Sequence, residues 1–333
     1  MDRYIIVGGH RLEGDVRVDG SKNSVLPVLA ATIINGKESV IHNVPELKDV
    51  DSLIGLLRTI GCKCLFENNT LIVKSNNSLD TLIPEKPVRE MRSSIILMGA
   101  MLARNGKVKI SYPGGCEIGP RPIDIHLFGL RKMGTKIIEA HGYISCECDK
   151  LRGVEINLDY PSVGATENIM LAATTAEGVT IIQNAAKEPE IVDLQNFLNG
   201  MGARITGAGT STVKIEGVKE FRDVEHTVIP DRIVAGTLMS AAAITGGNVV
   251  LNNVITDHLK SVSSKLSETG CIITEYQNSL QIMCNRKPKA AEVIKTLPYP
   301  GFATDMQAQM MAVMTIAKGT SIFIETVFES RYK

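Results

Sequence analysis

The stretch ATENIMLAATTAEGVTII, residues 165–182, predicts a helix of small and apolar residues, a turn at Gly178 and a β-branched strand. Glycine is favoured where a helix ends, because it adopts the left-handed backbone conformation without strain, and β-branched residues favour strands. The same pattern occurs five times, at Ser24–Val40, Ser93–Ile110, Ala165–Ile182, Ile233–Leu251 and Ala303–Ile324, with turn glycines Gly36, Gly106, Gly178, Gly247 and Gly319.

A second helix pattern alternates with the first. It places apolar residues at i, i+3, i+4 and i+7, as Leu53, Leu56, Leu57 and Ile60 do, and it also ends at a glycine before a strand. Within each series, neighbouring glycines lie 68 to 73 residues apart by subtraction, so the chain repeats a mixed α/β module. Copies of the second pattern are Asp49–Cys64, Ile123–Ile137, Ile191–Ile205 and Asp257–Ile273, with glycines Gly61, Gly134, Gly202 and Gly270.

The fifth copy ends after its first half. Phe328–Lys333, the last residues, lie where the second helix pattern should begin. We therefore expect a chain that is cut short by at least half a module and whose final domain is incomplete.

Length and composition indicate a globular protein with more than one core. The chain has 333 residues, 44% of them hydrophobic and 22% charged, which suits two domains. Lys+Arg and Asp+Glu are both 36 and tryptophan is absent, so nothing favours a nucleic-acid or membrane partner. The apolar run Tyr4–Val7 is too short for a signal peptide or a membrane span, and we expect a cytoplasmic protein.

Seven cysteines occur, at positions 62, 64, 116, 146, 148, 271 and 284, and in a reducing compartment we expect all of them to be thiols. The pairs Cys62-x-Cys64 and Cys146-x-Cys148 could bind zinc. However, alternate residues of a strand share one face, which explains both pairs without a metal. We expect no metal site.

Cys116 differs from the other cysteines because it lies in the glycine-rich stretch Pro113–His126. Glycines in this stretch favour an exposed surface loop, and the nearby Arg121 favours a thiolate or attracts an anion. The alternative is a small buried hydrophobic residue, which is the usual role of a lone cysteine. The glycine, proline and charge around Cys116 argue against burial.

Seven short motifs are distributed over the whole chain. They are Gly20-Ser21-Lys22-Asn23 with Leu26-Pro27, Met91-Arg92-Ser93-Ser94, Pro113-Gly114-Gly115-Cys116, Gly119-Pro120-Arg121-Pro122, Pro161-Ser162-Val163-Gly164-Ala165-Thr166, Pro230-Asp231-Arg232 and Thr304-Asp305-Met306-Gln307. Together they resemble the motifs of the UDP-N-acetylglucosamine 1-carboxyvinyltransferase family of enolpyruvyl transferases. The sister family that makes enolpyruvylshikimate phosphate shares the repeat but lacks the cysteine loop.

The resemblance implies a two-domain inside-out α/β barrel with three modules in each domain, helices inside, sheets outside and the active site in the cleft between domains. The first domain would be residues 22–229. The second, incomplete domain would be residues 1–21 plus 230–333. The family is longer than this chain, and its additional segment carries two further active-site arginines.

The reaction implied by the resemblance has two stages and needs no cofactor. The sugar 3′-hydroxyl adds to C2 of phosphoenolpyruvate while C3 is protonated, and phosphate then leaves as C3 loses a proton. Cys116 matches the acid, which can also bond covalently to phosphoenolpyruvate. Lys22, Asn23 and Arg121 match the residues that bind phosphoenolpyruvate. The partners expected are therefore phosphoenolpyruvate and UDP-N-acetylglucosamine.

Other matched residues would hold the nucleotide sugar. Asp305 matches the base beside the 3′-hydroxyl, although an isolated aspartate before Met306 is more often a helix N-cap. For Lys22 alone, a solvated lysine is the ordinary interpretation, and for Ser162 an N-cap is compatible with diphosphate binding. The remaining matches are Arg92, Arg121, Pro122, Ile123, Asp124, Ile125, Ser162, Val163, Gly164 and, as an apolar wall, Val327.

Two positions depart from the family pattern. Ala303 replaces a proline that is common before Thr-Asp-Met-Gln, and Tyr160 stands where some members have lysine against the nucleotide. One alternative remains open, in which the chain is a non-catalytic remnant that at most binds the nucleotide sugar.

Overall fold

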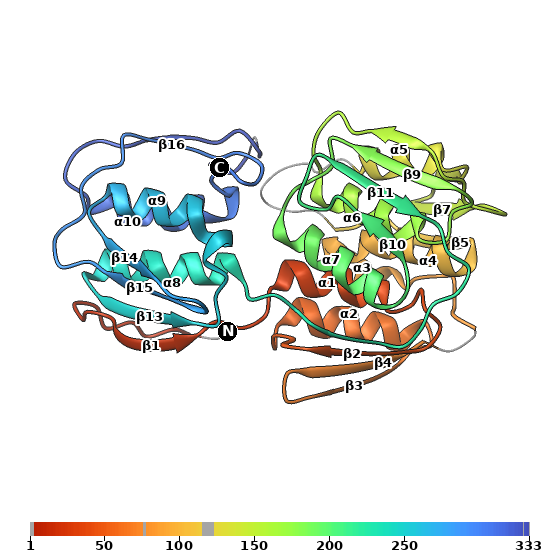
Figure 1. The fold of residues 1–333 in the computed structure, drawn as a ribbon, viewed down its shortest axis with the longest axis horizontal. Helices are drawn as coiled ribbons and strands as arrows, with labels where there is room; N and C mark the ends of the chain where they lie inside the picture. Colours follow the sequence, from red (N-terminus) through yellow and green to blue (C-terminus); the bar gives the residue numbers. More distant parts are fainter. Residues whose placement is uncertain (1–2, 76–77, 115–122, 329, 333) are drawn as a thin grey trace. The chain divides into compact units, whose positions relative to one another are not determined.

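The computed structural model describes residues 3–75, 78–114, 123–328 and 330–332. The chain divides into two compact units (Figure 1). The larger contains Gly20–Ile229, and the smaller contains the residues up to Asp19 together with Pro230–Arg331. The chain passes from the smaller unit to the larger at Asp19–Gly20 and returns to the smaller unit at Ile229–Pro230.

The larger unit is built from three copies of the predicted module, each with its own small sheet. The first copy pairs β2 in parallel with a strand from the far end of the unit, β12, and continues into an antiparallel hairpin, giving the strand order β12-β2-β4-β3. Its elements are α1 (Lys22–Ala31), β2 (Glu38–His42), α2 (Lys48–Thr59), β3 (Lys63–Glu67), β4 (Thr70–Lys74) and β12 (Val224–Thr227).

The second and third copies follow the same plan. Their sheets have the strand orders β5-β7-β6 and β10-β11-β9-β8. In the third copy, β8 pairs in parallel with β9, as β12 does with β2 in the first. The second copy comprises α3 (Glu85–Glu90), η1 (Arg92–Ile96), α4 (Leu97–Asn105), β5 (Lys107–Ser111), α5 (Asp124–Lys132), β6 (Lys136–Ala140) and β7 (Tyr143–Glu147). The third comprises β8 (Glu155–Asn157), α6 (Val163–Ala173), β9 (Val179–Gln183), α7 (Pro189–Gly200), β10 (Arg204–Thr206) and β11 (Thr212–Glu216).

The smaller unit contains a fourth copy and the first half of a fifth. The N-terminal strand β1 pairs in parallel with β13, and the sheet order is β1-β13-β15-β14. Its elements are β1 (Glu13–Arg17), α8 (Arg232–Thr245), β13 (Asn248–Asn252), η2 (Thr256–Leu259), α9 (Lys260–Glu268), β14 (Ile272–Glu275) and β15 (Ser279–Met283). The fifth copy adds β16 (Val293–Lys295), η3 (Thr304–Met306), α10 (Gln307–Thr315) and β17 (Ile322–Ile324).

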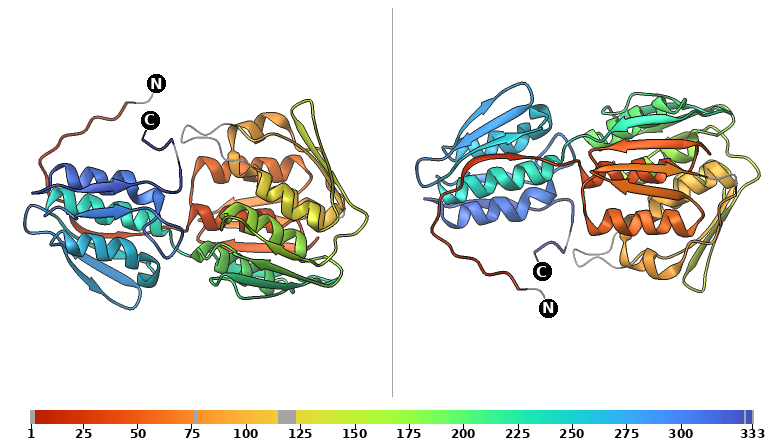
Figure 2. Two further views of the ribbon diagram at one scale, coloured as in Figure 1. Left: turned by 90° about the horizontal axis from the view of Figure 1, so that it is seen from above. Right: turned by 90° about the horizontal axis from the view of Figure 1, so that it is seen from below.

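Helices form the inside of the larger unit and sheets its outside, which confirms the predicted inside-out α/β class (Figure 2). Helix α6 is buried on every side from Ala165 to Ala173, and it packs against α4, α5 and α7. A Cβ on Gly99 would lie 2.1 Å from the carbonyl oxygen of Asn168, so α4 and α6 approach too closely for any other residue there. The outer strand β6, in contrast, is largely exposed.

All nine predicted helix–strand passages are present, but the role of the glycines differs between the two series. In the second series, Gly61, Gly134, Gly202 and Gly270 directly follow the C-cap residue and have positive φ, as predicted. In the first series the cap prediction holds at Gly106. The prediction for Gly247 is wrong, because the left-handed cap of α8 is Gly246, with φ 65°. The remaining three turn glycines lie several residues beyond their helices.

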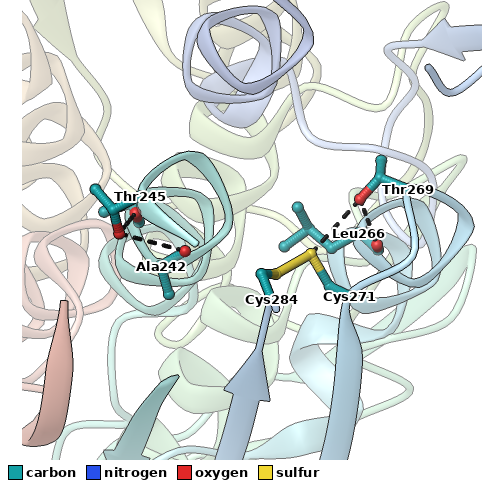
Figure 3. The surroundings of a disulfide bond; sticks show 7 residues. Ala242, Thr245, Leu266, Thr269, Cys271 and Cys284 are labelled. Atoms are coloured by element: carbon teal, nitrogen blue, oxygen red, sulfur yellow. Dashed lines mark hydrogen bonds between the residues drawn. A yellow bond between two sulfur atoms is a disulfide. The ribbon is translucent and has the colours of Figure 1, made fainter. Parts of the chain in front are cut away.

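The expectation that all seven cysteines are thiols is wrong for two of them. Cys271 and Cys284 form a disulfide, with Cα atoms 4.7 Å apart (Figure 3). Cys271 precedes β14 and Cys284 follows β15, so the bond joins the open ends of one hairpin, where the strand register places the two residues opposite each other. This proximity depends on the pairing of β14 with β15, which the local sequence pattern does not contain.

The prediction that the two Cys-x-Cys pairs are strand side chains is confirmed for one cysteine of each pair. Cys64 belongs to β3 and Cys146 to β7, while Cys62 and Cys148 lie immediately beside these strands. Across the ranges described above, no three His, Cys, Asp or Glu side chains gather as a metal site would require. Nor does any helix in that part of the chain have the length and apolar character needed to cross a membrane.

Candidate active site

The first turn of α1 carries the Gly20–Asn23 motif. Gly20 is required there, because a Cβ would lie 1.8 Å from the backbone oxygen of Asn43. Ser21 caps the helix by accepting a hydrogen bond from the N–H of Ser24 at 3.3 Å. Lys22 is the first helical residue, and its Nζ lies 3.4 Å from Asp49 Oδ2, with both side chains 43% exposed. An exposed pair of this kind is weak and screened by solvent, so the Lys22 ammonium is accessible to an anion.

A second group of predicted residues lies at the ends of three other elements of the larger unit. Arg92 begins η1, and Asp124 begins α5, where its side chain is exposed. Ser162 caps α6 by accepting the N–H of Ala165 at 3.3 Å, so the N-cap interpretation is confirmed. The side chain of Ile123 is buried, which leaves its backbone as the part available to a ligand. Ile125, Val163 and Gly164 are half-buried.

His126 joins this group, although the sequence motifs assigned it no role. A Cβ on Gly164 would lie 3.0 Å from Cε1 and 3.4 Å from Nε2 of His126, so this edge of the imidazole lies against the first turn of α6. Burial first, and the charge of Arg92 second, lower the pKa of His126 to about 4, so the imidazole is neutral at pH 7.

Hydrogen bonds determine the tautomer of His126. The Oδ1 atom of Asn168 accepts the N–H of Gly99 at 2.7 Å, which leaves its Nδ2 to donate to His126 Nδ1 at 2.8 Å. Because Nδ1 accepts, the proton of the neutral ring resides on Nε2. Within the described part of the chain this Nε2–H has no hydrogen-bond partner, so the edge that lies against Gly164 carries an available donor.

The pH dependence of stability should reflect His126. Its pKa is lower in the folded protein than the ordinary value of 6.5, so between pH 6.5 and about 4 the unfolded chain binds a proton that the folded chain does not. The free energy of unfolding should therefore decrease by about 3 kcal/mol as the pH falls through this range, given a pKa shift of this size. We expect His126→Gln to remove most of that pH-dependent loss in urea denaturation, measured against the unsubstituted protein. The control is His10→Gln, because His10 is exposed. If the free energy of unfolding depended equally on pH in both variants, the assignment would be contradicted.

Asp305 lies in the smaller unit and pairs with an arginine that the sequence analysis missed. Arg331 Nη1 is 3.3 Å from Asp305 Oδ1 and 3.1 Å from Thr304 Oγ1, and the Arg331 side chain is only 14% exposed. Ala303, not Asp305, is the N-cap of η3, and α10 has no side-chain cap, so the N-cap interpretation of Asp305 is wrong. No local pattern connects positions 305 and 331, because helix α10 and strand β17 lie between them in the chain.

Val327 is connected to the same group through Glu325. The carboxylate of Glu325 accepts the hydroxyl of Thr304 at 2.9 Å and the N–H of Val327 at 2.8 Å. Although burial acts to raise the pKa of Glu325, the hydrogen bonds from the N–H groups of Val327 and Phe328 and from hydroxyls lower it overall. The smaller unit thus holds Asp305 and Val327 in one hydrogen-bonded cluster.

Ala303 already has the backbone conformation of a proline. Its φ is −64° and its ψ is 132°, and within the described residues its N–H has no hydrogen-bond acceptor. We therefore expect Ala303→Pro to raise the free energy of unfolding by about 0.4–1 kcal/mol, because proline reduces the freedom of the unfolded chain. Urea denaturation measures this change. A loss of stability would show that the turn does not tolerate the ring.

Three predicted residues, Cys116, Arg121 and Pro122, lie outside the described residues. The described free thiols are poor nucleophiles in comparison with an ordinary cysteine. Burial is the first cause that raises the pKa of Cys62 and Cys146 to about 12, that of Cys64 to about 11, and that of Cys148 above its ordinary value.

Comparisons with known proteins agree with these motifs. The family model for EPSP synthase (3-phosphoshikimate 1-carboxyvinyltransferase) matches residues 6–333. A UDP-N-acetylglucosamine 1-carboxyvinyltransferase 2 from Caldanaerobacter subterraneus subsp. tengcongensis is 58% identical over 100% of this chain and 80% of its own length. The chain belongs to the UDP-N-acetylglucosamine 1-carboxyvinyltransferase family. A second member of this family from the same organism, UDP-N-acetylglucosamine 1-carboxyvinyltransferase 1, is 54% identical over 99% of this chain and 79% of its own length.

Solved structures show the same fold. The enolpyruvyl transferase NikO from Streptomyces tendae matches with a TM-score of 0.85 and 22% identity, over 98% of this chain and 78% of NikO. An EPSP synthase from Acinetobacter baumannii matches with a TM-score of 0.67 over 86% of this chain and 67% of its own. Because the family matches span 99–100% of this chain, they do not support the expected truncation. They also do not favour the alternative of an inactive remnant.

Proposed function

We propose that this protein transfers the enolpyruvyl group of phosphoenolpyruvate to the 3′-hydroxyl of UDP-N-acetylglucosamine and releases phosphate, as a cytoplasmic step of peptidoglycan synthesis. The observation that carries the proposal is the 58% identity, over the whole chain, to a relative named for this activity. The products are enolpyruvyl-UDP-N-acetylglucosamine and inorganic phosphate. In the addition step, the 3′-oxygen bonds to C2 of phosphoenolpyruvate and C3 gains a proton. In the elimination step, the C2–O bond to phosphate breaks and C3 loses a proton.

In this proposal the first turn of α1 binds phosphoenolpyruvate. The Lys22 ammonium is accessible, and the half-buried Asn23 beside it can both donate and accept hydrogen bonds. A fixed cation aimed at the phosphate is the kind of electrostatic contact that stabilises charge in transition states. Arg121 supplies a second cation and Cys116 the acid that protonates C3, and Cys116 can also form a covalent adduct with phosphoenolpyruvate.

The nucleotide sugar is assigned to the ends of η1, α5 and α6. Backbone N–H groups at the start of α6, with the Ser162 cap, suit a diphosphate, and Arg92 adds positive charge. The neutral His126 fits this role, because its Nε2–H offers a donor without the cost of burying a second cation beside Arg92. Arg121, Pro122, Ile123, Asp124, Ile125, Val163 and Gly164 complete the assigned contacts.

The smaller unit contributes the base in this proposal. Asp305 accepts the proton of the 3′-hydroxyl. Arg331 donates a hydrogen bond to Oδ1 of the Asp305 carboxylate, which leaves Oδ2 for the substrate. Val327 contacts the sugar. We also propose that residues 22–229 and residues 1–21 plus 230–333 are the two functional domains.

The test is phosphate release from phosphoenolpyruvate with and without UDP-N-acetylglucosamine, together with the mass of the product. We expect release only with both substrates, and a product heavier than the nucleotide sugar by one enolpyruvyl group. Shikimate 3-phosphate serves as the competing acceptor, because the family model also carries the name of EPSP synthase. If the protein turned over shikimate 3-phosphate but not UDP-N-acetylglucosamine, shikimate 3-phosphate would be the acceptor and the proposal would be wrong. Binding of UDP-N-acetylglucosamine without turnover would favour the inactive alternative.

A further inference from the structure

A buried carboxylate on α7 connects three separate segments of the larger unit. Asp193 is 2% exposed, and its Oδ2 accepts hydrogen bonds from the hydroxyl of Ser24 on α1 and from the N–H of Ile229 at 3.4 Å. Its Oδ1 accepts from His226 Nε2 on β12 at 2.9 Å. The imidazole of His226 is packed against the ring of Phe197, also on α7, with ring centroids 5.6 Å apart.

A carboxylate in such surroundings constrains its partners. Burial without hydrogen bonds is expensive, so the groups that satisfy Asp193 are held at hydrogen-bonding distance from it. The donors come from two distant segments, α1 with Ser24 and the end of β12 with His226 and Ile229. Loss of the His226 contact would leave Oδ1 unsatisfied, and displacement of Ser24 would leave its buried hydroxyl without this acceptor. The position of Ser24 relative to α7 and β12 is therefore determined by Asp193.

Ser24 belongs to the same helical turn as Lys22 and Asn23. A further contact anchors this turn from the same side, because Ser21 donates its N–H to the carbonyl oxygen of Ile229 at 2.8 Å. The exposed Lys22–Asp49 pair cannot provide comparable anchoring, since its two side chains are 43% exposed. The buried side of the turn is thus fixed through Asp193 and Ile229, while its other side presents Lys22 and Asn23.

We propose that Asp193 is a positioning residue for Lys22 and Asn23. This inference rests on the proposed function, in which these two residues bind phosphoenolpyruvate. Through Ser24, the Asp193 carboxylate sets the place of the first turn of α1 and so the distance from the Lys22 ammonium to the phosphate. The contacts assigned to the nucleotide sugar lie at the ends of η1, α5 and α6 and, in the smaller unit, at Asp305 and Val327. None of them involves Ser24, Asp193 or His226.

The consequence is a selective effect on one substrate. Small displacements of a positioned group can reduce catalysis by up to about a hundredfold. We expect Ser24→Ala and Asp193→Asn to raise the KM for phosphoenolpyruvate by about tenfold to a hundredfold. We expect the Kd for UDP-N-acetylglucosamine to stay within about twofold. Because both substitutions act on the same Ser24–Asp193 contact, the double variant should be little worse than the more strongly affected single variant.

The experiment measures phosphate release with phosphoenolpyruvate titrated, calorimetric binding of each substrate, and thermal unfolding. The control is Thr174→Ala, which removes another fully buried hydroxyl whose bond, to Leu171 O at 2.7 Å, stays within its own helix region. It should lose stability without a change in the KM for phosphoenolpyruvate. If Asp193→Asn does not fold, Ser24→Ala still tests the proposal, because it leaves the contacts of Asp193 with His226 and Ile229 in place.

The outcomes separate this proposal from the proposed function. An active unsubstituted protein with an unchanged KM for phosphoenolpyruvate in Ser24→Ala rejects positioning by Asp193 and leaves the function intact. Equal losses for both substrates would also reject it, because they would indicate a general structural defect. An unsubstituted protein that neither turns over nor binds phosphoenolpyruvate rejects both.

Discussion

Replacing Lys22 with alanine is expected to reduce kcat/KM for phosphoenolpyruvate by roughly two to three orders of magnitude, which corresponds to about 3–4 kcal/mol. The substitution removes a cation at the first turn of α1, whereas the nucleotide sugar is assigned to other elements. We therefore expect calorimetry to show lost phosphoenolpyruvate binding and nearly unchanged binding of UDP-N-acetylglucosamine.

The fold should tolerate this change. The Lys22 side chain is 43% exposed and its partner Asp49 is equally exposed, so the loss of their ion pair should cost at most about 1 kcal/mol of stability. The exposed Lys37→Ala is the matched control, because it removes one positive charge from the same unit. Unchanged phosphoenolpyruvate affinity in Lys22→Ala would remove this residue from the proposed site.

Alkylation of Cys116 by an epoxide mimic of phosphoenolpyruvate, such as fosfomycin, is expected to abolish transfer activity. The cysteines in the described part of the chain should react with the epoxide much more slowly than Cys116. A pKa of about 12 instead of 9.0 leaves Cys62 and Cys146 with about a thousandfold less thiolate than an ordinary thiol, and the disulfide leaves Cys271 and Cys284 with none. Cys116 also lies in a glycine-rich stretch beside Arg121, which favours access and a thiolate.

Peptide mapping after brief treatment of the native protein measures this selectivity. Cys116 should carry the label, and Cys116→Ser should block labelling and inactivation together. Cys62→Ser should remain as sensitive as the unsubstituted protein. Labelling of Cys62 or Cys64 before Cys116 would reject the assignment. Denaturation without reductant should expose further thiols but leave Cys271 and Cys284 unlabelled.

The sequence predicted the elements of this fold well because their signals are local. Apolar spacing at Leu53, Leu56, Leu57 and Ile60 predicts α2, and glycines such as Gly61 supply the positive φ that the turn after a helix requires. The number and order of the helix–strand passages follow from these signals. The motif residues at the ends of α1 and α6 could also be located, because Ser21 and Ser162 are ordinary N-caps.

The sequence did not predict contacts between distant segments. Strand β12 pairs in parallel with β2, and β1 pairs in parallel with β13. Each pairing joins segments that are far apart in the sequence and depends on the tertiary fold of its unit. The Cys271–Cys284 disulfide depends on hairpin register, and the Asp305–Arg331 pair depends on the path of the chain after β17. Neither periodicity nor spacing along the chain encodes these distances.

Composition and local pattern determined that this protein is a repeated α/β chain, and its motifs resemble those of enolpyruvyl transferases. Tertiary structure decided the chemical state of particular groups. His126 is neutral and protonated on Nε2 because it is buried against Asn168 and near Arg92. Asp193 anchors α1 because folding brings Ser24, His226 and Ile229 to one carboxylate. The physical reason is that helix and strand preferences act over a few residues, whereas burial and charge depend on neighbours that only packing brings together.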